Sequence, residues 1–164
     1  MPQHTVSFLV ENRPGVLFKV SNLFRRRGYN ITSLTVGPVE GSPLSRMTVV
    51  VDAESRILNQ IVEQLDKMVD VVKVKRLDPI KTLSRELLLI KIKTSDPIAR
   101  IETVNTVNAY HGLILDVEPE ILIAEITGPP EEIDAFLKSI TPIGIEEMSR
   151  TGAAAIERGS FKLS

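Results

Sequence analysis

The sequence predicts an α+β protein of two tandem ferredoxin-like domains, because the element order β-α-β-β-α-β occurs twice along the 164 residues. In the first half, apolar residues alternate with a period of two over 6–10 and then recur at helical spacing over 16–24. The polar stretch 78–85 contains a proline and separates the two halves. The predicted domains are residues 1–78 and 86–164, joined by a linker at 79–85.

The first predicted helix covers residues 15–27. The arginines at 25–27 complement the negative end of the helix dipole, and Gly28 suits the left-handed conformation that often ends a helix. In the strand that follows, the apolar residues fall out of phase, which predicts a β-bulge near Thr32 and Ser33. The first half is then predicted to continue with strand 30–39, turn 40–43, strand 45–53, helix 57–69 and strand 71–77.

The second half repeats this order with different residues. The predicted elements are strand 86–94, a helix over 96–112 that ends at Gly112, a tight pair of strands within 113–128, helix 129–140 and strand 143–151; no element is predicted for 152–164.

Apolar residues, for example Leu9 and Val50, are also predicted to point outward from edge strands of the first domain. Because exposed sheet faces and edges favour pairing with another chain, we expect a homodimer.

Composition excludes several classes of function. The formal net charge is −1, which gives no overall attraction to nucleic acid or to an anionic membrane, and aromatic residues, at 4%, offer few stacking surfaces. The chain has no cysteine, so thiolate chemistry is absent, and its two histidines, His4 and His111, fall in different predicted domains, so we expect no metal site. The first residues lack the pattern of a signal peptide and no apolar run could span a bilayer, so we expect a cytoplasmic protein.

The segment "ENRPG", residues 11–15, lies between the first strand and the first helix. The first backbone amides of a helix lack intrahelical partners and favour an anion, and Gly15 would let a ligand approach the backbone closely. Asn12 can both donate and accept hydrogen bonds. Two interpretations remain open: Asn12 caps the helix and Pro14-Gly15 form only a turn, or the turn binds a carboxylate.

The second repeat provides an internal comparison. Its turn "SDPIAR" keeps the proline but has Ile98 in place of the glycine, and its segment "GLI" has no counterpart of Asn30. Because the two features are lost together, Gly15 and Asn30 are predicted to share a purpose in the first domain.

The sequence resembles the regulatory (small) subunit family of acetolactate synthase, also called acetohydroxyacid synthase. The resemblance rests on "ENRPGVLFKVSNLFRRRGYNITSLTVGPVEGSPLSRMTVVV", which is similar to the N-terminal ACT domain of that family, and it continues through "SRELLLIKIK", "EITGPPEEIDAFL" and "GIEEMSRTG". It implies that the first domain is an ACT domain.

The resemblance implies a regulatory subunit without catalytic activity of its own. Such a subunit activates a catalytic large subunit, which would carry the thiamine diphosphate, Mg²⁺ and FAD, and it confers feedback inhibition by valine or another branched-chain amino acid. The resemblance also implies that one chain of a homodimer holds the charged end of the effector and that its partner chain completes the site. The implied effector-binding residues are Asn12, Gly15, Val16 and Leu17 of one chain with Asn30 and Ile31 of the other.

Two alternatives stay open at this stage. An acylphosphatase-like enzyme would use Arg13 and Asn30 in a phosphate cradle, and a free-standing ACT regulator would sense an amino acid on behalf of another enzyme. The stretch "FKVSN" departs from the usual sequence of the family. Its Phe18 leaves open which amino acid is the preferred effector.

Overall fold

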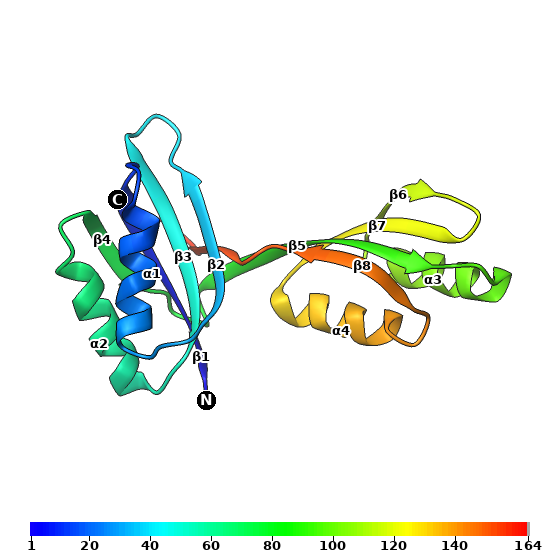
Figure 1. The fold of residues 1–164 in the computed structure, drawn as a ribbon, viewed down its shortest axis with the longest axis horizontal. Coiled ribbons are helices and arrows are strands. Elements are labelled where there is room, and N and C mark those ends of the chain that lie inside the picture. Colours follow the sequence, from blue (N-terminus) through cyan, green and yellow to red (C-terminus); the bar gives the residue numbers. More distant parts are fainter. Residues whose placement is uncertain (164) are drawn as a thin grey trace. The chain divides into compact units, whose positions relative to one another are not determined.

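The computed structural model describes residues 1–163, which form two compact units (Figure 1). The first unit comprises Met1–Leu83 together with the C-terminal segment from Gly152 onward, and the second comprises Ser84–Thr151. Each unit pairs an antiparallel sheet with two helices, so the predicted fold class of two ferredoxin-like domains is confirmed. Residues 152–163 group with the first unit, whereas the sequence analysis assigned them to the second domain.

The first unit has a four-stranded sheet in the order β2-β3-β1-β4, with α1 and α2 on one face (Figure 1). A register shift between Ile31 and Ser33 confirms the bulge that the sequence predicted in β2. The core lies between the sheet and the helices, where Phe8 and Met47 pair across β1 and β3 and Phe24 of α1 is 1% exposed. The elements are β1 (Gln3–Glu11), α1 (Val16–Arg26), β2 (Ile31–Pro38), β3 (Leu44–Asp52), α2 (Ser55–Asp66) and β4 (Val71–Arg76).

The second unit has strands in the order β6-β7-β5-β8 and two helices. Its core contains Ile90, Leu122 and Phe136, and Tyr110 meets Phe136 edge to face at 5.5 Å between ring centroids. The elements are β5 (Thr82–Lys93), α3 (Pro97–Ala109), β6 (Leu113–Val117), β7 (Ile121–Gly128), α4 (Pro130–Ile140) and β8 (Ile145–Arg150), and β9 (Ala154–Glu157) pairs with β5.

Three predicted boundaries were wrong. Helix α2 ends at Asp66 rather than at 69, and the predicted linker 79–85 is shorter because β5 already begins at Thr82. Helix α3 ends at Ala109, and the left-handed residue after it is His111, with φ of 54°, rather than Gly112. Gly112 is needed for packing instead, because a Cβ there would lie 2.9 Å from the backbone carbonyl oxygen of Glu125.

Residues 152–163, here called the C-terminal strap, cover the face of the first sheet that the helices leave free. Side chains along the paired strands β1 and β3 point alternately to the two faces of the sheet. Leu9 pairs with Arg46, and both lie on the face away from the helices. The Arg46 guanidinium donates to the carbonyl oxygen of Ala155 at 2.8 Å, and Ala153 is 1% exposed. The prediction that Leu9 and Val50 lie outward on edge strands was therefore wrong: β1 and β3 are central strands, Leu9 is buried and Val50 is half-buried.

Glu157 fastens the strap to the sheet. One carboxylate oxygen accepts the backbone N–H of Asp78 at 3.0 Å and the other accepts from the Lys75 ammonium at 2.9 Å. Lys75 also lies 3.2 Å from the centre of the Phe161 ring, a second strap residue. The hydrogen bond from Asp78 and the pairing with Lys75 lower the pKa of the Glu157 carboxyl.

The lowered pKa makes the contribution of Glu157 dependent on pH. A carboxyl whose pKa is lower in the folded state than in the unfolded state stabilises the fold above the unfolded pKa, and this stability is lost as the pH falls through the folded pKa. We expect Glu157→Gln to unfold at a lower temperature than the wild type at pH 7, and the difference to shrink as the pH falls below the ordinary carboxyl value of 4.5. Thermal unfolding followed by circular dichroism measures both.

Glu40→Gln, at an exposed position, is the matched control. An equal unfolding temperature for Glu157→Gln and the wild type at pH 7 would contradict the role of Glu157.

Candidate functional site

The turn between β1 and α1 presents unpaired backbone amides. Gly15 is the N-cap of α1 with φ of 85°, and no side chain caps this helix. Among the described residues, the amides of Gly15, Leu17 and Phe18 have no hydrogen-bond partner, while the amide of Val16 donates to the Arg13 carbonyl at 3.4 Å. The amino terminus of α1 therefore offers donors and the positive end of a dipole to an anion.

The capping interpretation of Asn12 does not hold. The Asn12 side chain makes no hydrogen bond within residues 1–163, whereas its backbone N–H donates to the Pro43 carbonyl at 3.2 Å. The equivalent helix of the second unit is different, because the Asp96 side chain caps α3 by accepting the Ile98 amide at 3.0 Å. The second unit thus satisfies its own helix terminus, and the first leaves Asn12 and the α1 amides available.

Asp70 holds this turn in place, a role that the sequence analysis missed. Its backbone carbonyl accepts the Glu11 amide at 2.9 Å, and its carboxylate accepts from Lys19 of α1 at 2.7 Å. Arg13 is paired with Glu11 at 2.5 Å and lies 3.9 Å from Asp70. The hydrogen bond from Lys19 lowers the pKa of the Asp70 carboxyl, so this carboxylate is charged at neutral pH. We call Asp70, with its bonds to Glu11 and Lys19, the clamp. No sequence pattern indicates it, because Asp70 and Lys19 are 51 residues apart.

Asn30 and Ile31 lie far from this turn within one chain. They begin β2, and β1 and β2 run in the same direction because each is antiparallel to β3. Gly15 and Asn30 are therefore at opposite ends of α1, whose 11 residues span about 16 Å. A single chain cannot bring Asn30 to the turn, and the phosphate cradle of an acylphosphatase-like enzyme, which needs Arg13 and Asn30 together, is not present.

The edge strand β2 carries no charged residue. Its sequence is "ITSLTVGP", whereas β4, at the other edge of the sheet, contains Lys73, Lys75 and Arg76. Charged side chains commonly protect an edge strand from pairing with another chain, so β2 is the edge open to pairing. Exposed apolar side chains occur on β2 and at the start of α1: Val36 is 43% exposed, Leu17 44% and Phe18 73%.

Other classes of site find no support within the part of the chain that the structure describes. No group of three or more His, Asp or Glu side chains is placed to hold a metal ion among residues 1–163. Over the same residues, no helix has the length and apolar character to cross a membrane.

Comparison with known proteins identifies the family. A family model described as "AHAS small subunit-like ACT domain" matches residues 6–73, and a second, described as "Small subunit of acetolactate synthase", matches residues 85–159. The chain belongs to the acetolactate synthase small-subunit family. The first model covers the turn, α1 and β2, so the first unit is an ACT domain, as the resemblance implied.

Relatives match this family assignment over nearly the whole chain. The chain is 45% identical to a probable acetolactate synthase small subunit of Methanothermobacter thermautotrophicus, over 96% of this chain and 94% of that one. It is 44% identical to the acetolactate synthase small subunit of Mycolicibacterium smegmatis, over 96% and 92%. The crystal structure of the acetolactate synthase small subunit from Thermotoga maritima superposes with a TM-score of 0.90 at 40% identity, covering 98% of this chain and 100% of that one.

The conformation of Gly15 leads to a prediction about the turn itself. Any side chain at φ of 85° is strained, although an added Cβ would meet nothing within 4 Å. We expect Gly15→Ala to lower the free energy of unfolding by about 1 kcal/mol, as measured by urea denaturation. Gly37→Ala is the matched control, because Gly37 also has open space around it but no positive φ. Equal losses in the two variants would show that the left-handed turn conformation is not needed.

Proposed function

We propose that this chain is the regulatory subunit of an acetolactate synthase and that its first unit binds valine or another branched-chain amino acid between two copies of the chain. The observation that carries the proposal is the amino terminus of α1, where unpaired amides and the unbonded side chain of Asn12 lie beside an uncharged edge strand. The family assignment supports a regulatory role. The effector-binding residues are Asn12, Gly15, Val16 and Leu17 of one chain with Asn30 and Ile31 of the other.

Two-fold symmetry explains why two chains are needed. Pairing the same edge strand of two identical chains about a two-fold axis makes the two strands antiparallel. The start of β2 in one copy then faces the end of β2 in the other, and that end is level with Ser45 and Val10, next to the turn. Asn30 and Ile31 of one copy thus approach the Gly15 turn of the other. The hydrogen bond from the Asn12 amide to Pro43 supports this, since it sets the turn against the β2–β3 hairpin.

The proposed site, with residues from both chains, suits a zwitterion with a small apolar side chain. The α1 amides and the helix dipole favour the carboxylate, and the side-chain oxygens of Asn12 and Asn30 can accept from the ammonium group. Leu17 and Ile31 supply apolar contact. Arg13 and Lys19 are already engaged by Glu11 and Asp70, so no free cation at the turn favours an amino acid with a second carboxylate.

The catalytic chemistry is assigned to a separate large subunit. We propose that this chain has no activity alone, that it activates the large subunit, and that thiamine diphosphate, Mg²⁺ and FAD are bound by that partner. Family membership supports a catalytic partner. A cytoplasmic location is part of the same proposal. The alternative, an ACT regulator of another enzyme, predicts the same amino-acid binding but no effect on an acetolactate synthase large subunit.

Calorimetry of the full chain with valine, leucine and isoleucine tests the effector site. We expect the wild type to bind at least one of them, and Gly15→Asp to weaken binding at least tenfold. The new carboxylate would repel the effector's anionic end and compete for its amides, and charge-assisted hydrogen bonds contribute about 1.5–3 kcal/mol each. Asn30→Ala should weaken binding by about tenfold through the loss of one such contact.

The control is Asn105→Ala, at an exposed position in the second unit, which should bind as the wild type does. Circular dichroism and gel filtration establish that each variant is folded. Undiminished binding by folded Gly15→Asp would reject the site, and a wild type that binds none of the three amino acids would reject the effector class.

A further inference from the structure

We infer that Gly152, where the C-terminal strap crosses β2, is the contact through which an effector bound at the edge of the first sheet controls the rest of the chain. This inference rests on the proposed effector site and adds the route of its regulation. The route begins at β2, the strand that would carry Asn30 and Ile31 into the partner's site, and it leaves the first unit along the strap.

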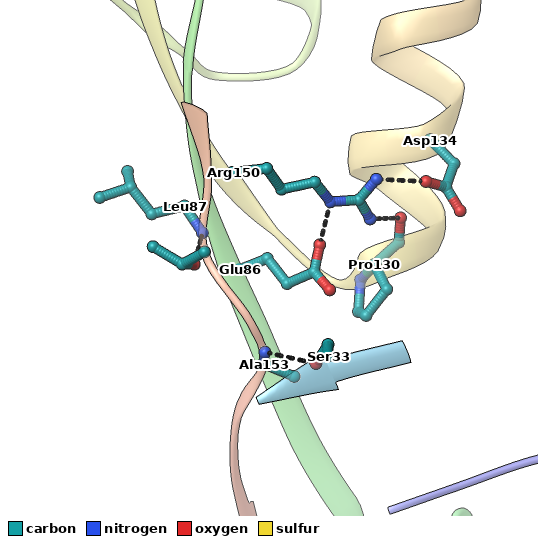
Figure 2. Close-up of polar contacts among 8 residues, drawn as sticks. Ser33, Glu86, Leu87, Pro130, Asp134, Arg150 and Ala153 are labelled. Carbon is teal, nitrogen blue, oxygen red and sulfur yellow. Dashed lines mark hydrogen bonds and ion pairs between the residues drawn. The ribbon is translucent and has the colours of Figure 1, made fainter. Parts of the chain in front are cut away.

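The packing at Gly152 leaves no free space. A Cβ added to Gly152 would lie 2.6 Å from the Thr35 hydroxyl and 2.7 Å from the Leu34 carbonyl oxygen. Real Cβ atoms do not approach backbone oxygens this closely, so only glycine allows the strap to cross β2 here. One residue further, the Ala153 amide donates to the Ser33 hydroxyl at 3.4 Å (Figure 2). A shift of β2 against β3 is therefore transmitted to the strap by direct contact.

The same contact contains an unsatisfied polar group. The Thr35 hydroxyl is buried and has no hydrogen-bond partner within the described chain, residues 1–163. A buried hydroxyl without a partner disfavours the arrangement that contains it. A second position of β2 or of the strap that gives this hydroxyl a partner would gain that hydrogen bond, so the inference places the element with two arrangements at Thr35 and Gly152.

The residues that precede the strap are held firmly within the second unit. Only Thr151 separates Gly152 from Arg150, and Arg150 is fixed within its own unit (Figure 2). Its guanidinium bonds the Glu86 carboxylate at 2.5 Å and the Asp134 carboxylate of α4 at 2.7 Å, and Glu86 is 7% exposed. The Thr151 backbone amide donates to Leu87 of β5 at 3.0 Å. The two residues before Gly152 are therefore fixed by hydrogen bonds within the second unit, and the covalent chain carries the proposed route from Gly152 to them.

The test separates effector binding from effector action. Gly152→Ala is measured by valine calorimetry of the full chain and by valine inhibition of the complex with an acetolactate synthase catalytic subunit. We expect valine to bind within about twofold of the wild type, while the concentration for half-inhibition rises at least about fivefold, the lower end of usual allosteric couplings. Asn59→Ala, at an exposed position of α2 outside both β2 and the strap, should change neither value.

A second variant keeps the inference testable if Gly152→Ala does not fold. Thr35→Val removes the unpartnered hydroxyl with little change in shape, so it changes the balance between the two arrangements without breaking the contact. We expect the valine dissociation constant and the half-inhibition concentration to shift together, in the same direction, by at least about twofold. Unchanged inhibition in folded Gly152→Ala, or unchanged values in Thr35→Val, would overturn the relay and leave the effector site standing. A wild type that binds none of valine, leucine and isoleucine would instead remove the proposed function, and a wild type that binds only leucine or isoleucine is tested in the same way with that amino acid.

Discussion

The helix terminus after β1 is the constraint on which the proposed function depends. Gly15 takes a left-handed conformation that other residues adopt at a cost, and this turn delivers the first amides of α1 without a side-chain cap. Asp70 fixes the same turn through Glu11 and Lys19, so the amides are held in place rather than exposed on a loose loop. A rigid, unsatisfied donor set is what a carboxylate ligand requires, because little ordering remains to be done on binding.

In the proposed effector site, the edge strand β2 of a second copy of the chain completes the binding site at this helix terminus. Because Asn30 begins β2 at the opposite end of α1, the effector site that we propose needs another copy of the chain, and the absence of charge along β2 leaves that edge open to it. The other free surface of the first sheet is already covered, since the strap occupies the face opposite the helices through Ala155, Glu157 and Phe161. Pairing at the edge is therefore favoured over pairing face to face, and the expected homodimer stays a prediction, although Leu9 and Val50 do not lie on edge strands.

Local patterns predicted much of this architecture. The alternation in β1, the helical spacing of α1 and the phase break in β2 each depend on residues within one element, and all three were found where the sequence indicated. The comparison of the turn at Gly15 with the one at Ile98 also pointed to a real difference, since Asp96 caps the second helix and nothing caps the first.

What the sequence did not reveal depends on contacts between distant residues. Arg46 and Ala155 are 109 residues apart, and Asp70 and Lys19 are 51 apart, so neither the strap nor the clamp leaves a local pattern. No element was predicted for the tail for this reason, although Ala153, Ala155 and Phe161 contact residues of the first sheet.

A mixed dimer tests the two-chain site most directly. Gly15→Asp and Asn30→Ala chains carrying different tags are combined, the mixed dimers are isolated, and valine binding is measured by calorimetry. One site of the mixed dimer contains both substitutions and the other contains neither. We therefore predict about one site per mixed dimer with wild-type affinity, and no such binding by either parent dimer. Mixed dimers that bind no better than their parents would contradict a site shared between two chains.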